Sequence, residues 1–394
     1  MKKIILTILL GFACAFAPVL NAKADFSFKD IELNFVQISD THISNREDTN
    51  YKALSSSKEL LKDAIEQVNN LKPVDFVMFT GDMVNEPDKE SYRDFFVLLT
   101  KLKYPSLTTF GNHDMRQIAL IPDDAPDNVK KYISKDEALE IIRKCNPFYI
   151  FNKSYYAFSP RRDYRVIVLD TTVDDAITAN GILKDEMAEF LKEEIESHKD
   201  KVILIFQHHP VVEPFKSEHH KITNSDTYMD IIKQYKKTPI AIFSGHYHAA
   251  KITKQGNIIH VSTPSLVTYP NAFRYISITN YNDRTIFKFK YFETSLYEVQ
   301  KRSKIGAIAS ATLKGLPNDH DVEITIRKSI NNDNDIKEPK QKLTKEDKQM
   351  QKEIKQAKKE LEKQEKAQAR AEQRKIKQLQ KQAPKEQTPE DARN

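Results

Sequence analysis

Short apolar runs alternate along the chain with longer segments that carry apolar residues at helical spacing. The runs predict strands at 33–38, 74–80, 107–110, 164–169, 202–206 and 240–243. The intervening spacing predicts helices over 51–71, 92–102, 184–198 and 225–236. After residue 248 the pattern changes, and turn residues separate further strands predicted at 258–262, 275–279 and 285–292. This alternation predicts a sheet-rich α/β fold over about residues 30–300.

Two segments depart from the alternation. Residues 115–155 contain three prolines and show no regular spacing, so we expect an inserted cap or a long loop there. Residues 304–330 contain alternating apolar positions at Val322, Ile324 and Ile326, which predict a small β extension.

The chain ends in a Lys/Glu/Gln-rich tail, residues 337–394. Its composition favours a lone charged helix or disorder, and an apolar seam through Met350, Ile354 and Leu361 favours a short coiled coil as the alternative. The tail carries 18 Lys and Arg against 11 Asp and Glu, which leaves 44 against 45 in the rest of the chain. The net charge of +6 therefore belongs to the tail, and the body gives no indication of specific nucleic-acid recognition.

The first 24 residues have the pattern of a secretory signal peptide. A basic start precedes a largely apolar stretch over 4–20, and Ala22-Lys23-Ala24 is a small-x-small cleavage site. We expect cleavage after Ala24 and export to the periplasm or the extracellular space. A membrane anchor is the alternative, because the apolar stretch has about the shortest length that spans a bilayer. Cleavage leaves Cys145 as the single cysteine, so we expect no internal disulfide.

Five of the predicted strands end in Asp, Asn or His. The polar stretches are Asp40-Thr41-His42, Gly81-Asp82, Gly111-Asn112-His113-Asp114, His208-His209-Pro210 and Gly245-His246-Tyr247-His248. The chain has only eight glycines, and three of them directly precede Asp82, Asn112 and His246. Glycine permits sharp turns and close backbone approach. Because ligands bind outside the carboxyl ends of strands in open α/β sheets, we expect these side chains to meet at one site.

The side chains at these strand ends are metal ligands by type. Carboxylate and amide oxygens combined with imidazole nitrogens suit Mn, Fe or Zn better than Ca. Asp40-x-His42 and His246-x-His248 share a one-residue spacing, so the members of each pair can face one ion. With His208 the ligands are too many for one tetrahedral ion, whereas two divalent ions sharing a carboxylate would fit. Sites with two such metal ions hydrolyse phosphate esters.

The ordered series Asp-x-His, Gly-Asp, Gly-Asn-His-Asp, His-x-Pro and Gly-His-x-His resembles the calcineurin-like metallophosphoesterase superfamily over about residues 34–295. The resemblance implies a four-layer α/β/β/α sandwich. The stretch from Gly81 to Glu86 lacks the Arg-Gly of Ser/Thr protein phosphatases and the Tyr of purple acid phosphatases. The short motifs, with Gln207-His208-His209-Pro210, look most similar to those of cyclic-nucleotide and glycerophosphodiester phosphodiesterases.

The same resemblance implies a role for each residue of the site. The implied ligands are Asp40, His42 and His248 for one ion, Asn112, His208 and His246 for the other, and Asp82 as the bridge. The usual ligand lies two residues before Pro210, which favours His208 and leaves His209 as the alternative. His113 would be the catalytic group, oriented by Asp114. The implied reaction is attack on phosphorus by a metal-bridging hydroxide, with His113 protonating the leaving group.

These patterns together predict an exported, metal-dependent phosphoric ester hydrolase that acts on a small phosphoester, with a leaning to diesters. A phosphomonoesterase or nucleotidase is the alternative within enzymes. An envelope-associated binding protein, whose basic tail contacts an anionic surface, is the alternative from another class. The pattern leaves the natural substrate, the metal pair and the oligomeric state open.

Overall fold

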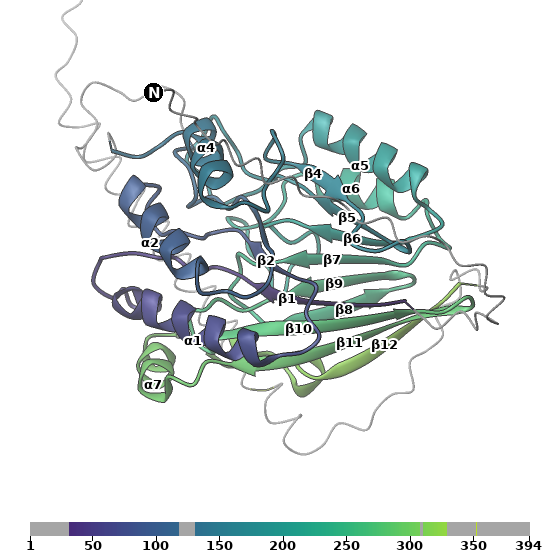
Figure 1. Cartoon of the computed structure of the whole chain (residues 1–394). Helices are drawn as coiled ribbons and strands as arrows, with labels where there is room; N and C mark the ends of the chain where they lie inside the picture. Colours follow the sequence, from purple (N-terminus) through teal and green to yellow (C-terminus); the bar gives the residue numbers. More distant parts are fainter. Residues whose placement is uncertain (1–30, 118–130, 308–309, 329–351, 353–394) are drawn as a thin grey trace, which may run out of the picture. The chain divides into compact units, whose positions relative to one another are not determined.

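A computed structural model describes residues 31–117, 131–307, 310–328 and 352. The strands in these ranges form two six-stranded sheets (Figure 1). No helix in the same ranges is long and apolar enough to cross a membrane. The predicted signal peptide and the tail from residue 337 lie outside them, apart from residue 352.

The first sheet has the strand order β12-β11-β10-β1-β2-β3. Its parallel half consists of β1 (Ile31–Ile38), β2 (Phe76–Thr80) and β3 (Ser106–Thr109). Its antiparallel half consists of β10 (Ala272–Asn280), β11 (Arg284–Glu293) and β12 (Val322–Arg327). Because β1, β2 and β3 run parallel, their carboxyl ends emerge at one edge of the sheet.

The second sheet has the order β4-β5-β6-β7-β9-β8. Four parallel strands form its centre: β5 (Tyr164–Val168), β6 (Val202–Phe206), β7 (Ile240–Ser244) and β9 (Ile258–Ser262). The edge strands β4 (Tyr156–Phe158) and β8 (Lys251–Gln255) are antiparallel. Strands β6, β7 and β9 are buried along their whole length, as expected of parallel strands covered on both faces.

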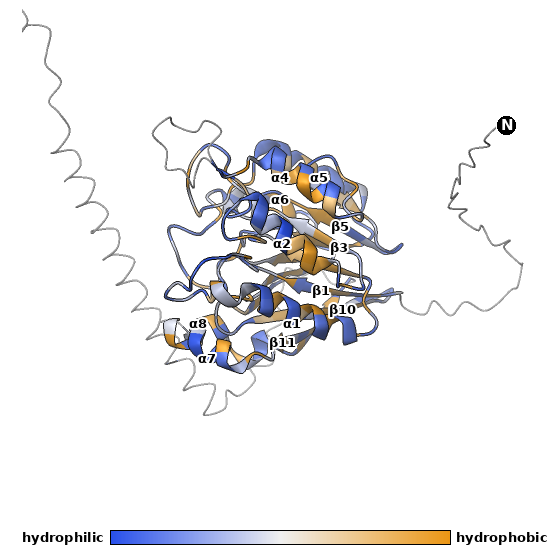
Figure 2. Ribbon diagram, turned by 60° about the vertical axis from the view of Figure 1, so that its left-hand side comes forward, coloured by the Kyte–Doolittle hydropathy of each residue, from blue (hydrophilic) through white to orange (hydrophobic). Residues whose placement is uncertain are grey.

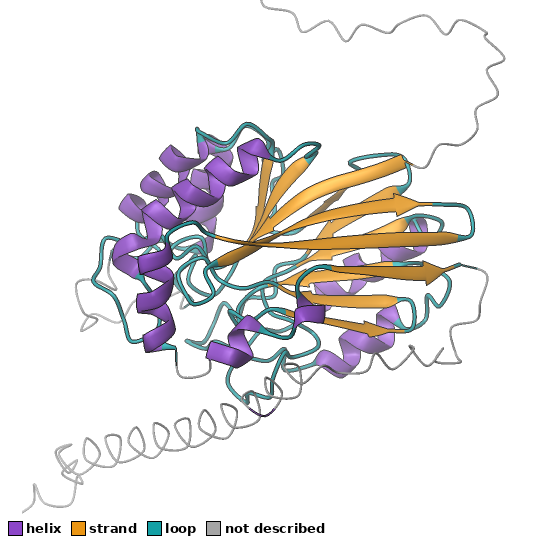
Figure 3. Ribbon diagram, turned by 90° about the horizontal axis from the view of Figure 1, so that it is seen from below, coloured by secondary structure: helices purple, strands orange, loops and turns teal. Residues whose placement is uncertain are grey.

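Helices cover the outer faces of both sheets (Figure 3). The first sheet carries α1 (Ser57–Asn70), which follows the 3₁₀ turn Leu54–Ser56, and α2 (Lys89–Leu99). The second sheet carries α5 (Asp185–Ser197) and α6 (Ser225–Ile232). The helices are amphipathic, with hydrophobic residues on only part of each ribbon (Figure 2). The succession of helix, sheet, sheet and helix confirms the predicted four-layer sandwich.

Aromatic side chains from both sheets meet in the core. The Phe35 ring of β1 stacks on Phe76, with ring centroids 5.1 Å apart, and meets the edges of Phe206 and Phe243 at 5.4 and 5.2 Å. All four rings are buried. Since Phe206 and Phe243 belong to the second sheet, Phe35 lies where the two sheets pack together.

Several elements were not indicated by the apolar pattern. The helix α4 (Lys135–Cys145) lies within the segment expected as a cap or long loop. It begins with a capping box, in which Ser134 Oγ accepts from the Glu137 N–H and the Glu137 carboxylate accepts from the Ser134 N–H. Only Ala138 and Ile142 of this helix are buried, too few to give a periodic signal. Strand β4 is too short for such a signal, and β8 is too polar.

The chain beyond β11 packs back on the sandwich. It forms α7 (Tyr297–Gly306), α8 (Ser310–Lys314) and the short 3₁₀ helix Pro317–Asp319 before β12. Strand β12 contains the alternating apolar positions noted in the sequence and pairs with β11, so it extends the first sheet.

We expect Phe35→Ala to lower the free energy of unfolding by about 3–5 kcal/mol, because the lost ring leaves a cavity between the sheets. Urea unfolding of the full chain, followed by circular dichroism, measures the change. The control is Val97→Ala, at a position 56% exposed, which should change the stability by less than about 0.5 kcal/mol. Equal unfolding of both variants would show that the sheets do not depend on this ring.

Candidate metal centre

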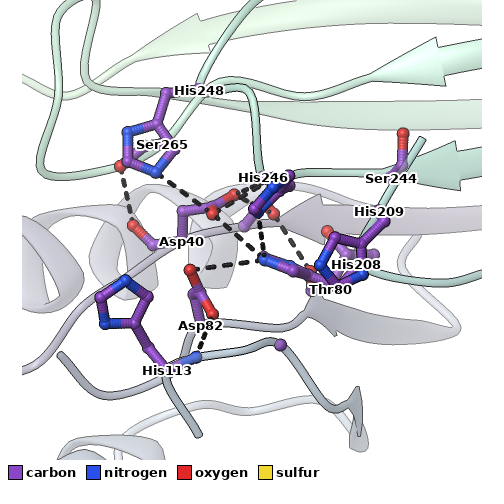
Figure 4. A network of polar contacts seen from close by, with 12 residues as sticks. Asp40, Thr80, Asp82, His113, His208, His209, Ser244, His246, His248 and Ser265 are labelled. Carbon is purple, nitrogen blue, oxygen red and sulfur yellow. Dashed lines mark hydrogen bonds and ion pairs between the residues drawn. The ribbon is translucent and has the colours of Figure 1, made fainter. Parts of the chain in front are cut away.

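The predicted metal ligands all follow directly after parallel strands. They lie after β1, β2, β3, β6 and β7 and comprise Asp40 and His42, Asp82, Asn112, His208, and His246 and His248. The sheet topology places the carboxyl ends of these strands together. Figure 4 shows Asp40, Asp82, His208 and His246 joined in one network of polar contacts.

Hydrogen bonds connect the strand ends of the two sheets. The His246 N–H donates to both carboxylate oxygens of Asp40, at 3.2 and 3.0 Å. One layer deeper, the Gln37 side-chain amide donates to the Ser244 carbonyl at 3.1 Å. Within the first sheet, the Asp40 N–H donates to the Gly81 carbonyl at 3.1 Å. These bonds fix the two halves of the site against each other.

Five of the predicted ligands have left-handed backbone conformations. They are Asp40 (φ 52°), His42 (41°), Asp82 (51°), His246 (68°) and His248 (53°). A non-glycine residue in this region costs on the order of 1–3 kcal/mol and persists only where the surrounding structure enforces it. Such residues cluster at functional sites, where the turn directs a side chain that a continuing strand would direct elsewhere.

Glycines leave room for the two carboxylates. A Cβ atom at Gly245 would lie 2.3 Å from Asp40 Oδ2, and one at Gly111 would lie 2.2 Å from Asp82 Oδ1. A side chain at either position would displace the carboxylate beside it. This close approach explains why glycine stands at these strand ends.

Asp40, His42 and His248 form a first group of donor atoms. His248 Nε2 lies 3.3 Å from Asp40 Oδ1 and 3.2 Å from His42 Nε2. His42 Nε2 lies 4.0 Å from the same oxygen of Asp40. His248 Nδ1 contacts Thr268 Oγ1 at 2.8 Å, which turns its Nε2 toward the group. The arrangement suits three ligands of one ion.

Asp82 lies between this group and a second group that contains His208, His209 and His246. Its Oδ2 is 3.5 Å from His42 Nε2 and 3.4 Å from His208 Nε2. His208 Nε2 is in turn 3.1 Å from His246 Nδ1. A carboxylate oxygen at nearly equal distance from ligands of both groups is placed to bridge two ions.

Unpartnered buried atoms also point to bound metal. Asn112 Oδ1, His209 Nε2 and His246 Nε2 are buried and have no hydrogen-bond partner among the described residues. Buried polar atoms without a partner are rare and require an explanation. Together with the two groups of donors, they fit two divalent ions.

The electrostatics of the site favour metal-binding protonation states at Asp82, His42 and His246, but not at His208. Although burial opposes it, the charges of neighbouring histidines, chiefly His208, hold the pKa of Asp82 well below its ordinary value. Burial lowers the pKa of His42 and of His246 well below the ordinary value, which keeps both rings neutral. Against the effect of burial, Asp82 raises the pKa of His208 to about 9. A metal bound at this ring would displace that proton.

The His208-His209 pair places two imidazoles at the second group. His208 Nδ1 lies 2.8 Å from the Thr80 carbonyl, so this nitrogen carries the proton and Nε2 faces Asp82. His209 Nδ1 contacts Thr171 Oγ1 at 2.9 Å, and its buried Nε2 has no partner among the described residues. His208 Nε2 lies 3.4 Å from Asp82 Oδ2, whereas His209 forms no ion pair with Asp82 within 4.0 Å. This difference favours His208 as the ligand.

His113 is oriented by a different group from the one expected. Its Nδ1 lies 2.8 Å from the Asn85 carbonyl, so that carbonyl, and not Asp114, sets the direction of the ring. The Asp114 carboxylate accepts instead from the N–H groups of Met83, at 2.7 Å, and Gly111, at 2.8 Å. The expectation that Asp114 orients His113 is therefore wrong. The Asp114 carboxylate accepts hydrogen bonds from backbone N–H groups in the loops that carry Asp82 and His113.

The two residues also differ in ionisation. Burial lowers the pKa of His113 to about 4, which favours a neutral ring with its proton on Nδ1. Burial and the charge of Asp82 raise the pKa of Asp114 to about 8, while the Gly111 and Val84 N–H groups oppose the shift.

Three residues that carried no motif signal also lie at the site. The His220 ring centroid is 5.4 Å from that of His246, and the half-exposed Tyr51 ring is 6.3 Å from that of His248. Lys52 Nζ is 3.5 Å from His42 Nδ1. Tyr51 and Lys52 fall within the helix predicted over 51–71, but they lie in the loop before the 3₁₀ turn at Leu54. His220 also lies in a loop. Only the tertiary structure brings the three residues to the proposed ligands.

Comparisons with known proteins agree with this geometry. The family description "Calcineurin-like phosphoesterase" matches residues 33–250. The chain is 27% identical to "Probable glycerophosphodiester phosphodiesterase GpdQ" of Arcobacter nitrofigilis, over 58% of this chain and 77% of that protein. It is 23% identical to "3',5'-cyclic adenosine monophosphate phosphodiesterase CpdA" of Pseudomonas aeruginosa, over 60% and 77%. A dimetal phosphatase structure from Danio rerio has the same fold, with a TM-score of 0.50 and 16% identity over 67% of this chain and 99% of that one.

We expect His208→Ala to lose one of two bound ions and His209→Ala to keep both, since only His208 faces the bridging carboxylate. Equilibration with Mn²⁺, gel filtration and elemental analysis give the metal content of each variant. Circular dichroism checks that both variants are folded. The opposite result, with the metal lost from His209→Ala alone, would make His209 the ligand.

Proposed function

Because this chain belongs to the calcineurin-like phosphoesterase family, we propose that it hydrolyses small phosphodiesters at a dinuclear metal centre. The observation that carries the proposal is the position of Asp82 Oδ2, 3.5 Å from His42 Nε2 and 3.4 Å from His208 Nε2. One carboxylate shared by two ligand groups is the arrangement that a two-ion phosphoesterase needs. The names of the two curated relatives, both phosphodiesterases, support the leaning to diesters.

The ligands proposed for the two ions follow from the groups described above. Asp40, His42 and His248 would hold one ion, Asn112, His208 and His246 the other, with Asp82 between them. Such a pair of ions supplies positive charge for the phosphoryl oxygens and lowers the pKa of a bound water. In this proposal, the substrate phosphate lies at the strand ends that carry the ligands, and its leaving group lies on the side of His113.

His113 is proposed to deliver a proton to the leaving oxygen. The Asn85 carbonyl holds its Nδ1, which leaves Nε2 as the nitrogen available to the substrate. The neutral ring of the free protein has to gain a proton for this role. A phosphate anion nearby favours that protonation, because opposite charge raises the pKa of an imidazole. The proton would then pass from Nε2 to the departing alkoxide.

Export is part of the proposal and rests on the signal-peptide pattern of residues 1–24. We expect protein recovered from outside the cytoplasm to begin at Asp25. Intact-mass measurement of that protein distinguishes cleavage from anchoring, since an uncleaved chain keeps the mass of its first 24 residues. Full-length protein confined to the membrane fraction would favour the anchor.

With added Mn²⁺, we expect the protein to cleave bis-p-nitrophenyl phosphate with a higher kcat/KM than p-nitrophenyl phosphate. Release of p-nitrophenol gives both rates. Preference for the monoester would instead indicate a phosphatase or nucleotidase.

Two variants test the assignment of the residues in the same assay. Asn112→Ala removes a proposed ligand and should abolish most of the activity. His113→Ala should retain both ions. Its kcat should fall by about 10²–10⁴ for a diester with an alkoxide leaving group, the usual contribution of a general acid, and by less for bis-p-nitrophenyl phosphate, whose p-nitrophenolate leaves without protonation. If neither ester is cleaved, or if both variants match the wild type, the catalytic proposal is wrong.

A further inference from the structure

Lys52 is a buried cation at the edge of the metal centre. It lies between the His42 motif and α1, and only 7% of the residue is exposed. Its ammonium group is 3.5 Å from His42 Nδ1 and 3.4 Å from Asn85 Oδ1. Asn85 also provides the carbonyl that orients His113. Lys52 therefore faces the same space as a proposed ligand and the proposed catalytic histidine.

The ammonium group has no close counterion. No carboxylate of the described residues forms an ion pair with Lys52 within 4.0 Å. Burial lowers the pKa of Lys52, and the charges of Asp82, Asp40 and Glu86 oppose that shift from farther away. The contacts with His42 Nδ1 and Asn85 Oδ1 are long for hydrogen bonds. Glu86 is engaged elsewhere, by Arg46 at 2.9 Å and by Ser44 at 2.9 Å. A buried charge without a close partner is costly, and an anion bound beside it would reduce that cost.

The loop that carries Lys52 is held from two sides. The Ala53 N–H donates to the Val267 carbonyl at 2.8 Å, and Arg302 of α7 pairs with Asp48 at 2.9 Å. Gly306 at the end of α7 packs so close that a Cβ there would lie 1.6 Å from the Asn50 carbonyl oxygen. The lysine is thus positioned in advance by a segment outside the family match at 33–250.

We propose that Lys52 binds a non-bridging oxygen of the substrate phosphoryl group. The phosphate then supplies the missing counterion, and the lysine stabilises the charge that builds up on phosphorus. This inference rests on the proposed function, because the proposed function places the phosphoryl group beside the proposed metal ligands. A phosphate dianion should gain more from the lysine than a diester monoanion, since the attraction scales with the charge.

The test uses the full chain loaded with Mn²⁺ and inorganic phosphate as the probe. Lys52→Met removes the charge and keeps the length of the side chain, Lys52→Arg keeps the charge, and Lys62→Met is the matched control. Lys62 lies on α1, its side chain is 54% exposed, and it pairs only loosely with Glu66, at 3.8 Å. Titration calorimetry measures the phosphate affinity, and elemental analysis measures the bound Mn²⁺ of each variant.

We expect Lys52→Met to weaken phosphate binding about tenfold to a hundredfold, as loss of a charge-assisted hydrogen bond does. Its bound Mn²⁺ should equal that of the wild type. Lys52→Arg keeps the charge and should therefore retain more of the phosphate affinity than Lys52→Met, and Lys62→Met should not differ from the wild type. The KM for bis-p-nitrophenyl phosphate should rise less than the phosphate dissociation constant.

Two results would overturn the inference. Phosphate binding equal to the wild type in Lys52→Met would exclude a contact with the phosphoryl group. Loss of Mn²⁺ or of folding in both Lys52 variants would make the lysine a structural residue. A wild type that binds phosphate through Lys52 but cleaves neither ester would leave this contact standing and remove the proposed function alone.

Discussion

The structure depends most on two buried carboxylates that lie close to three imidazoles. Asp40 and Asp82 are almost completely buried, and ring nitrogens of His42, His208 and His248 lie within 4.0 Å of one or both. A carboxylate oxygen of Asp40 and one of Asp82 lie within 4.8 Å of each other, and two negative charges at such a distance repel strongly in a protein interior. Protonated histidine can balance them, and divalent metal does so more fully. The chain has to hold this set together before any ion arrives.

The sandwich supplies that rigidity. The donors lie on strand ends whose backbones are fixed by parallel ladders, and the Phe35 cluster packs the two sheets against each other. The His246 N–H, which reaches from the second sheet to the Asp40 carboxylate of the first, ties the two halves at the site itself. Left-handed backbone at five ligands is tolerated because these contacts outweigh its local cost. The geometry of the site therefore depends on the packing of the two sheets in the core.

The segment after β11 adds a second layer of support. The Leu313 carbonyl accepts from the Ala250 N–H at 2.8 Å, and buried Asp319 accepts from the Ile252 N–H at 2.9 Å. Both contacts hold the chain just beyond the proposed ligand His248. The pair between Arg302 and Asp48 does the same for the loop of Lys52. The C-terminal helices thus brace the loops around the site, although they contribute no ligand to it.

The sequence by itself determined the buried parallel strands, the order of the polar residues at their ends and the chemical types of the candidate ligands. Apolar runs mark buried parallel strands locally, and a glycine followed by Asp, Asn or His marks a turn that directs a side chain. Tertiary structure alone decided the rest. In the folded chain, His113 contacts the Asn85 carbonyl, and the Asp114 carboxylate accepts from backbone donors. The loop residues Lys52, Tyr51 and His220 lie beside the proposed ligands. Hydrophobic periodicity does not predict where a loop residue lies in the fold, because its position depends on contacts made by distant parts of the chain.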